Sequence, residues 1–473
     1  MLGVEETYTD NVRLSTADSK RSDWVTLVRP AITINRTGAR TQFTATYAPQ
    51  LIYRANEGSN DVFHFLDAAG KAEIVQQLLF LDASATVTQQ NISLLGPQAQ
   101  SNINDTGNRT SVRAYSLSPY LRRQVGYEAL GELRFTHNTV SYSGNNLFSS
   151  DSNRIDARLF SGPAYKRTTW NAAYSKEHIS YDQTNQSVDF ESVSAGARRL
   201  LTANFGVQGN VGYEDNDYTT VGPAPRGRFW SVGPEWTPTP RTRLAATTGR
   251  RYYGPTHSLD FSHRTRLTTW RLNYHEDITT TRGQVFIPTT ADTGTLLDSL
   301  FLSTIPDPVA RRAAVQNYIS RTGLPPSLTV PLNFVTLVPF LQKSWDGSVG
   351  IQGVRNSIFA SVFMQTREAT APGQITAGDL GVSPRTKQTG GNVLWTHRLT
   401  AQTSSSVNVG YTRSDFTSIA REDNLKYIRL SLHKQFDPRV SGAVTLRRLE
   451  NESNETVGTY KENAITVAIS IRF

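Results

Sequence analysis

The chain ends with the stretch ITVAISIRF, residues Ile465 to Phe473, and this stretch decides the fold. Its odd-numbered positions hold Ile, Val, Ile, Ile and Phe, and its even-numbered positions hold Thr, Ala, Ser and Arg. Successive side chains of a β-strand point to opposite sides of the sheet, so the pattern predicts one apolar face and one small, polar face. A soluble sandwich buries such a face in its core, whereas an outer-membrane barrel turns it to lipid on every strand.

The same alternation recurs along the whole chain, which favours the barrel. It is clearest in the segments 42–53, 79–90, 205–214, 406–412, 427–433 and 440–447. Short turns are expected at Thr37-Gly38, Gln124–Tyr127, Lys166–Arg167, Thr239–Pro240, Val354–Asn356 and Asp437–Pro438. Longer polar connections fall between them at Ser15–Ser22, Leu94–Arg109, Ser143–Ser152, Thr219–Arg226, Ala369–Pro384 and Asn451–Tyr460.

Short turns that alternate with long loops are typical of outer-membrane barrels. The sequence therefore predicts an all-β fold: one transmembrane, antiparallel, up-and-down barrel over residues 1–473, with about 22 strands (roughly 20 to 24). An even number of strands places both termini in the periplasm of a Gram-negative cell. The last strand is expected to pair with Tyr8–Leu14 or a close neighbour, and the terminal Phe473 fits the aromatic ending that the barrel-assembly machinery recognises.

Composition agrees with this class. The 473 residues include no Cys, 19 Tyr, 20 Phe and 7 Trp, and the formal net charge is +9. Absence of Cys excludes disulfides and thiolate metal sites. Mean hydropathy is −0.41, a value that does not argue against a barrel because its two faces cancel. The first residues carry no signal-peptide pattern, and we interpret the chain as a mature form whose signal has been removed.

Six prolines fall within or beside expected strands. They are Pro30, Pro49, Pro119, Pro163, Pro234 and Pro339. Because proline removes a donor from the hydrogen-bond ladder, we interpret them as bends shared by neighbouring strands. The alternative is a weak sequence repeat at the level of a β-hairpin, since the sequences around Pro119, Pro163 and Pro234 are similar.

The segment Thr281–Asn333 breaks the strand pattern. Asp307 and Pro308 fit a helix start, and Gly323 with Pro325-Pro326 fits a helix end. We expect a long, partly helical loop, with Arg311, Arg312 and Tyr318 on its helix. It either caps the barrel on the outside or plugs the lumen.

Arginines dominate the predicted inner face. The candidate lumen-lining residues are Arg29, Arg134, Arg154, Arg158, Arg198, Arg271, Arg367, Arg398, Arg429, Arg447 and Arg472. Fewer acids share that face, namely Asp82, Glu128, Glu132, Asp156, Glu214 and Glu235. One interpretation is a conduit for anionic solutes or an acidic polymer, because guanidinium groups suit carboxylate and phosphate. The other is that arginines and acids pair across the wall and only fill the pore.

No catalytic constellation is evident. His257, Ser258, Asp260 and His263 form the densest polar cluster but match no nucleophile–base scheme. Glu214–Asp217 does not have the spacing of a calcium loop. We expect no enzymatic activity, no cofactor, no metal and no nucleic-acid partner.

The chain resembles the outer-membrane β-barrel proteins associated with PEP-CTERM/exosortase systems. The resemblance rests on residues 8–12, 79–83, 89–90, 118–121 and 161–163. Its most specific stretches are 297–301, 307–311, 323–325 and 353–356. It implies a role in exopolysaccharide export or surface display, with polysaccharide-export components as partners, and it supplies no catalytic residues.

Taken together, the sequence predicts an outer-membrane pore for exopolysaccharide or a similar anionic polymer. The alternatives are a non-conducting barrel that scaffolds an envelope complex, and a general diffusion porin. Lipid, lipopolysaccharide and the barrel-assembly machinery are the further expected partners.

Overall fold

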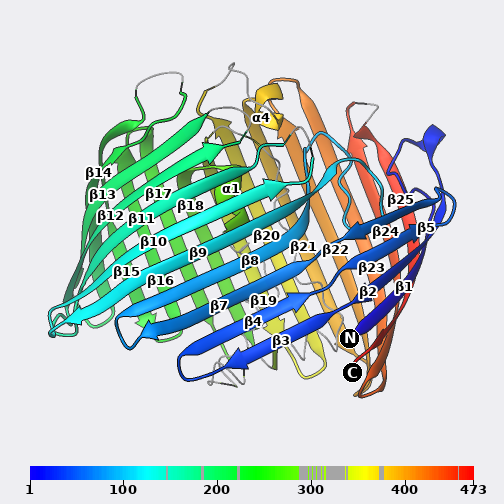
Figure 1. Cartoon of the computed structure of the whole chain (residues 1–473), viewed down its shortest axis with the longest axis horizontal. Coiled ribbons are helices and arrows are strands. Elements are labelled where there is room, and N and C mark those ends of the chain that lie inside the picture. Colours follow the sequence, from blue (N-terminus) through cyan, green and yellow to red (C-terminus); the bar gives the residue numbers. More distant parts are fainter. Residues whose placement is uncertain are drawn as a thin grey trace.

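The computed structural model describes most of the chain. It covers residues 1–144, 147–182, 186–220, 224–286, 339–371, 378–455 and 458–473, with the single residues Leu297, Phe301, Ile305, Arg311, Ala314, Val315 and Thr336. The described part forms one antiparallel sheet of 25 strands, which confirms the all-β prediction. The sheet curls around an interior, so that early strands lie in front of later ones in Figure 1.

The strands are numbered in chain order. The first nine are β1 Leu2–Thr9, β2 Asp23–Pro30, β3 Ile32–Thr37, β4 Thr41–Tyr47, β5 Gln50–Arg54, β6 Ser59–Phe63, β7 Leu66–Val75, β8 Leu79–Asn91 and β9 Arg109–Val125. The next nine are β10 Ala129–Tyr142, β11 Ser150–Ser161, β12 Thr168–Tyr181, β13 Ser187–Leu200, β14 Phe205–Asp215, β15 Arg226–Thr239, β16 Thr242–Arg251, β17 Gly254–Arg264 and β18 Thr268–Thr279. The last seven are β19 Phe340–Gln352, β20 Asn356–Ala369, β21 Arg385–Arg398, β22 Thr403–Phe416, β23 Arg421–Asp437, β24 Val440–Ser453 and β25 Tyr460–Ile471.

The first strand pairs with the last. β1 runs antiparallel to β25 from Leu2 opposite Ile471 to Thr9 opposite Ala464. On its other edge, β1 pairs with β2 over the same eight residues. The predicted partner, Tyr8–Leu14 or a close neighbour, agrees with β1 at Tyr8 and Thr9, but the strand begins six residues earlier, at Leu2, and ends at Thr9. Residues after Thr9 instead turn inward, where Val12 and Leu14 are buried.

Three early strands are interrupted at the same level. β2 and β3 are separated only by Ala31, β4 and β5 by Ala48 and Pro49, and β6 and β7 by His64 and Phe65. β2 pairs with β5 while β3 pairs with β4, so each interrupted pair follows one path across the sheet. Pro30 and Pro49 lie at the interruptions, where a missing backbone donor weakens the ladder. These two prolines act as the predicted bends.

The two ends of the sheet differ as predicted. Short turns connect strands at the end where both termini lie (Figure 1), for example between β15 and β16 and between β23 and β24. Longer segments connect strands at the opposite end, among them 92–108, 216–225 and 370–384. We call the first the turn end and the second the loop end.

The two faces also differ as predicted. In β25, Ile465, Val467, Ile469 and Ile471 are 37 to 50% exposed on the outer face, whereas Ala464 is 8% exposed on the inner face. Pairing across β24 keeps this parity, because Leu446 lies opposite Ile465 and Arg447 opposite Ala464. The alternation read from the terminal stretch therefore holds on the neighbouring strand as well.

Helices are few. The described ones are the short 3-10 turn η1 (Ala17–Ser19), α1 (Thr281–Phe286) and α4 (Asp379–Val382). Of the predicted loop helix, Asp307, Arg312 and Tyr318 lie outside the described residues. Arg311 is helical and buried, and it donates a hydrogen bond to the Ile305 carbonyl at 3.1 Å. Among the described helices, none has the length and apolar character needed to cross a membrane.

The exposed apolar face of β25 gives a direct test of membrane embedding. Val467→Arg places a charge on the outer face and is expected to cost about 2–4 kcal/mol of stability in a bilayer. Ala468→Arg is the matched control, because its side chain faces the interior, and it should cost much less. Urea unfolding in lipid vesicles measures both. Equal losses for the two variants would contradict the assignment of the faces.

Candidate functional site

The interior of the sheet carries a ladder of ion pairs. Arg134 lies 2.9 Å from the Asp82 carboxylate and 3.3 Å from that of Glu132, and its guanidinium stacks 3.8 Å from the Tyr120 ring centre. On β11, Asp156 accepts from Arg154 at 2.8 Å and lies 3.4 Å from Arg158. Asp82, Glu132 and Asp156 thus neutralise arginines that the sequence had placed on the same face.

Two further clusters extend this ladder around the wall. Glu235 pairs with Arg198 and lies 3.2 Å from Arg243. Arg251 bridges Glu214 at 2.5 Å and Asp277 at 2.6 Å. Each cluster joins residues from different strands, so the charges also tie the wall together.

The predicted set of inner acids was incomplete. Glu5 holds Arg29 at 2.6 Å, Glu177 lies 3.6 Å from Arg154, and Glu462 holds Arg447 at 2.8 Å. Glu128, by contrast, lies in the exposed turn between β9 and β10 and not on the inner wall. Applying the strand alternation to acidic residues as it was applied to arginines would have identified these three acids on the inner face.

The remaining predicted arginines fall into two groups. Arg367 is buried on β20 and donates to Gln388 at 3.3 Å, and Arg398 donates to the Val354 carbonyl at the turn end. Arg271 and Arg429 are on the inner face, and within the described chain neither side chain makes a hydrogen bond or ion pair. Arg472 follows β25 and is exposed.

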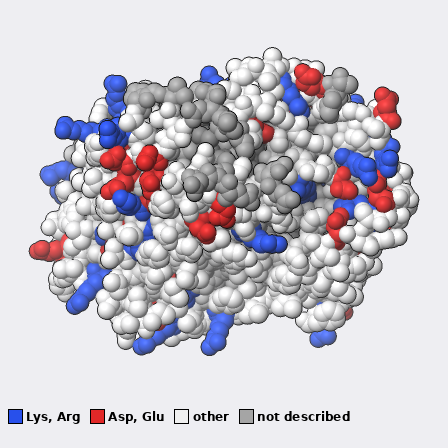
Figure 2. Space-filling model, turned by 45° about the horizontal axis from the view of Figure 1, so that its top comes forward, with Lys and Arg blue, Asp and Glu red and all other residues white. Residues whose placement is uncertain are grey.

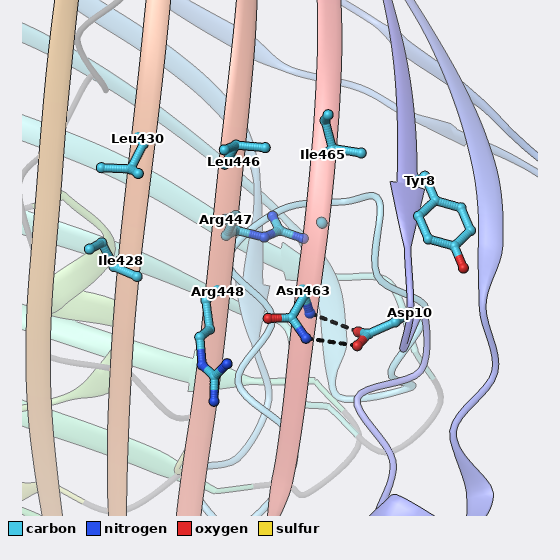
Figure 3. A pocket seen from close by; sticks show the side chains of 10 residues that line it. Tyr8, Asp10, Ile428, Leu430, Leu446, Arg447, Arg448, Asn463 and Ile465 are labelled. Atoms are coloured by element: carbon cyan, nitrogen blue, oxygen red, sulfur yellow. Dashed lines mark hydrogen bonds between the residues drawn. The ribbon is translucent and has the colours of Figure 1, made fainter.

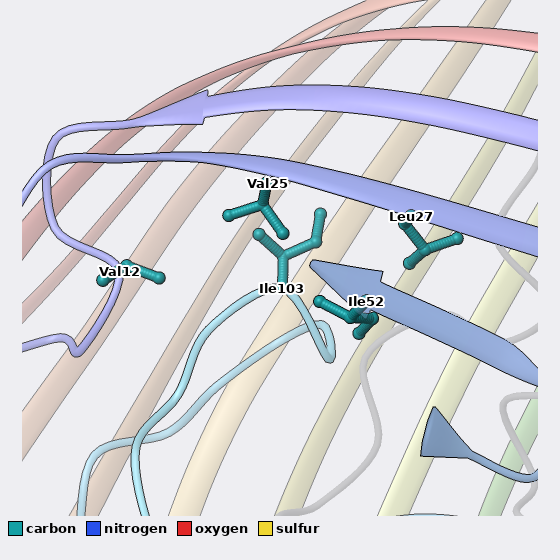
Figure 4. Packing of buried hydrophobic residues seen from close by; sticks show 5 residues of the cluster. All are labelled: Val12, Val25, Leu27, Ile52 and Ile103. Carbon is teal, nitrogen blue, oxygen red and sulfur yellow. The ribbon is translucent and has the colours of Figure 1, made fainter. Parts of the chain in front are cut away.

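A long loop, residues 92–108, folds into the interior beneath the early strands. Ile103 packs against Val12, Val25, Leu27 and Ile52, and Figure 4 shows it on the loop beneath β2, which carries Val25 and Leu27. Two further apolar contacts hold the loop elsewhere. Ala99 packs with Leu14, Leu425, Leu449 and Tyr460, and Leu94 packs with Phe340, Leu380 and Phe416.

Polar contacts fix the same loop to β24 and β25. Glu462 is 0% exposed and accepts from Asn104 at 2.7 Å, from Arg447 at 2.8 Å and from Thr9 at 2.8 Å. Arg447 also donates to Ser101 at 3.1 Å. A buried ion pair with this many hydrogen bonds is costly to break, because removing either partner leaves a buried charge uncompensated.

Arg54 and Asp379 form hydrogen bonds with the two end regions of the loop 92–108. Arg54 donates to the carbonyls of Ile103 at 3.1 Å and Asn102 at 3.0 Å. The Asp379 carboxylate accepts from the Ser93 hydroxyl and the Leu94 backbone N–H, both at 2.5 Å. Burial raises the pKa of Asp379, although these two hydrogen bonds and nearby arginines act in the opposite direction. The loop is therefore fixed at both ends and in its middle.

A second inward element approaches the opposite wall. Arg282 of α1 donates to Ser150 and Asn138 carbonyls at 2.7 and 2.6 Å, and to the Ser152 hydroxyl at 2.9 Å. Burial lowers the pKa of Arg282. The start of the segment Thr281–Asn333 is thus attached inside the sheet, whereas most of that segment lies outside the described residues.

The sequence placed 92–108 among the outer polar connections and missed its inward course. One signal was present, because Asn91 to Asn104 contains no charged residue. A solvent-exposed loop of that length rarely lacks charge, since charged side chains are the least often buried.

The polar clusters considered for catalysis or metal binding do not assemble. His257 and His263 contact Thr248 and Thr242 at 3.1 and 2.9 Å. Glu214 is occupied by Arg251. In the part of the chain that the structure describes, no three His, Asp or Glu side chains are grouped as metal ligands would be.

Comparison with known proteins places the fold. No family model matches the chain, and no curated protein is similar to it in sequence. The outer membrane transporter YddB from Escherichia coli is similar in structure, with 10% identity, coverage of 100% of this chain and 80% of that chain, and a TM-score of 0.50. The ferric-catecholate import receptor Fiu from E. coli K12 in its open form shares 7% identity over 99% of this chain and 81% of that chain, also with a TM-score of 0.50.

The outer membrane protein opdK from Pseudomonas aeruginosa matches at 9% identity, 99% and 96% coverage and a TM-score of 0.36, which is too distant to support an argument. Identities of this size inform on fold alone. The chain has the fold of an outer-membrane β-barrel.

Proposed function

We propose that the chain forms a closed barrel of 22 transmembrane strands that acts as an outer-membrane channel, narrowed by the loop 92–108. The pairing of β1 with β25 carries the proposal, because it leaves no free edge between first and last strands. Counting each of the three interrupted pairs, β2/β3, β4/β5 and β6/β7, as one strand reduces 25 strands to 22. Barrels of this size enclose a lumen that needs a plug or constriction to be selective.

The outer face supports membrane embedding. Exposed aromatic side chains occur near both ends of the strands, as in the aromatic girdles at membrane interfaces. Near the turn end they are Phe205, Trp236, Trp270, Trp395 and Phe436. Near the loop end they are Tyr8, Trp24, Tyr53, Tyr115, Tyr213, Trp230 and Tyr411.

A change from apolar to charged residues marks the edge of this band. Figure 3 shows Leu430, Leu446 and Ile465 on the outer face beside Arg448 and the Asp10–Asn463 pair. Figure 2 shows acidic and basic side chains gathered around the loop end, with a broad uncharged surface below them. The loop end is therefore proposed to face the outside of the cell and the turn end, with both termini, the periplasm.

The balance of charges on the inner face supports only a weak preference of the channel for anions. Most inner arginines are neutralised by carboxylates, so they stiffen the wall more than they attract solutes. Arg271 lies on the inner face of β18 opposite Ser262 and Ser348 and has no acid partner in the described chain. It is the arginine best placed to act on a passing anion.

A second candidate follows from the resemblance, namely passage of exopolysaccharide. The inner face of β20, β21 and β22 carries buried uncharged polar residues. They are Ser361, Gln365, Thr386, Gln388, Asn392, Thr396, Asn408 and Thr412. These uncharged groups are of the kind that hydrogen-bonds sugar hydroxyls, but they are only 1 to 8% exposed, so a passing polysaccharide would have to open the interior to reach them. Export would place polysaccharide-export components at the turn end. An enzymatic role has no support from the site.

Arg271→Glu tests the channel and its selectivity together. In planar bilayers we expect the wild-type protein to conduct with a preference for chloride over potassium, and the variant to lose or reverse it, a change of roughly twofold or more in permeability ratio. Arg448→Glu is the control, since Arg448 lies on the outer face. A sealed wild-type protein would overturn the channel proposal in favour of a scaffold, and unchanged selectivity would exclude Arg271 from the pathway.

Glu462→Gln tests the loop as the constriction. The change leaves Arg447 buried without its carboxylate, at a cost of about 3–5 kcal/mol, so the loop 92–108 should detach and conductance should rise. Glu452→Gln is the matched control, because Glu452 pairs with Lys426 at 2.6 Å and both side chains are 49% exposed, which makes that pair worth about 1 kcal/mol or less. Limited proteolysis of the loop reports its release. Release without increased conductance would show that the loop does not constrict the pore.

A further inference from the structure

The hydrogen-bond ladder of the wall is open between β6 and β8. β7 pairs with β8 as far as Leu66 opposite Val87. Beyond that point β6 pairs only with β5, and residues 88–91 of β8 pair only with β9. Every residue from 47 to 144 is described, so this seam is a feature of the fold.

The seam lies in line with the interruptions of the early strands. The level of Pro30 and Pro49 continues to His64 and Phe65, where the backbone between β6 and β7 is irregular. The Ala48 N–H donates to the Phe65 carbonyl at 2.9 Å, so the path of β6 and β7 stays attached to that of β4 and β5 across the interruption. The proline-induced bend therefore ends in a separated strand edge.

A cavity of about 270 Å³ occupies this seam. Phe65, which is 41% exposed, lines it together with Gln89 and Arg109, and the interior residues Glu5, Leu27, Arg29, Phe63 and Asn102 complete the lining. Its walls thus come from both faces of the sheet, so the cavity passes between the strands. Its size fits a small headgroup and is too small for a whole lipid.

Arg109 is the cation of this cavity with free donors. Its Nε and Nη1 are shielded from solvent and have no hydrogen-bond partner. The other arginines nearby are occupied, Arg29 by Glu5 at 2.6 Å and Arg54 by Asp61 and two loop carbonyls. A buried guanidinium without acceptors is unfavourable, and an oxyanion of tetrahedral shape would satisfy it.

The surroundings of Arg109 point to a ligand from the membrane. Thr110 and Val112 are buried on the inner face, so strand alternation places Arg109 on the outer face. It is the first residue of β9, at the loop end and beyond Tyr115 of the aromatic set there. Apolar residues flank the seam outside, with Val62 57% and Phe65 41% exposed. A headgroup phosphate at this level would have its acyl chains along those residues.

We propose that the seam between β6 and β8 is a lateral binding site for the phosphate headgroup of a membrane lipid, with Arg109 as its anion ligand. The lipid also covers strand edges whose backbone groups would otherwise be unpaired in the wall. The site is separate from the proposed channel and does not depend on conduction.

Binding of dioleoylphosphatidylglycerol to delipidated protein in neutral detergent tests the proposal. Native mass spectrometry or calorimetry should show one saturable site for this lipid, whereas dioleoylglycerol, which lacks the phosphate, should bind at least tenfold more weakly. Inorganic phosphate at equal concentration should not compete. Effective competition by inorganic phosphate would overturn a lipid in favour of a free anion, and equal binding of dioleoylglycerol would overturn a role for the phosphate.

Substitutions of Arg109 and Arg113 test whether Arg109 binds the lipid headgroup. Arg109→Gln should weaken the lipid at least tenfold, whereas Arg113→Gln should change it less than twofold, because Arg113 lies on the same face of β9 and does not line the cavity. Heat-modifiable gel mobility confirms that both variants are folded. If Arg109→Gln disturbs folding, Arg109→Lys, which keeps the charge, should retain most of the binding. Folded Arg109→Gln with wild-type affinity would overturn the proposal.

Discussion

Every strand of this sheet depends on having a partner at both edges, because unpaired backbone groups cost several kcal/mol each in hydrocarbon. The antiparallel contact of β1 with β25 answers this requirement where the two ends of the chain meet. The pairing of β25 with its other neighbour, β24, shows the parity of the wall, since Ile465 and Leu446 share the outer face while Ala464 and Arg447 share the inner one. The same alternation separates an inner from an outer face on these two strands.

The same alternation places many arginine side chains in the interior. Carboxylates on the same inner face neutralise most of them. Arg154, Arg198 and Arg251 meet carboxylates from other strands. The loop 92–108 uses one of these pairs, Arg447 with Glu462, as an anchor. Consequently the constriction of the proposed channel and the neutralisation of its wall share the same residues. In the proposed channel, a preference for anions therefore depends on the few inner arginines without an acid partner, above all Arg271.

Local periodicity was enough to predict the faces of the strands, the alternation of turns and loops, and the inner-face position of arginines such as Arg134 and Arg198. It could not predict what a loop packs against. Ile103 reaches Val25 and Ile52 only because the sheet curls, and nothing near Ile103 in the sequence encodes that curvature. The pairing of Arg29 with Glu5 was missed for a simpler reason, since β1 was placed six residues too late. Asp307, Arg312 and Tyr318 stay predictions.

The prolines connect the local chemistry to the proposed lipid site. Pro30 and Pro49 each lack a backbone N–H donor. The strand paths β2/β3, β4/β5 and β6/β7 are all interrupted at this level. Pairing resumes on the turn side, from Leu66 opposite Val87 onward, but not on the loop side. A seam in a membrane wall is tolerable only where something polar covers it or where it meets the headgroup region. Arg109, at the loop end of β9 with unsatisfied donors, lies where both conditions can be met by one ligand. The bend and the free guanidinium are thus parts of one feature, and the lipid proposed to bind there would complete the wall that the prolines interrupt.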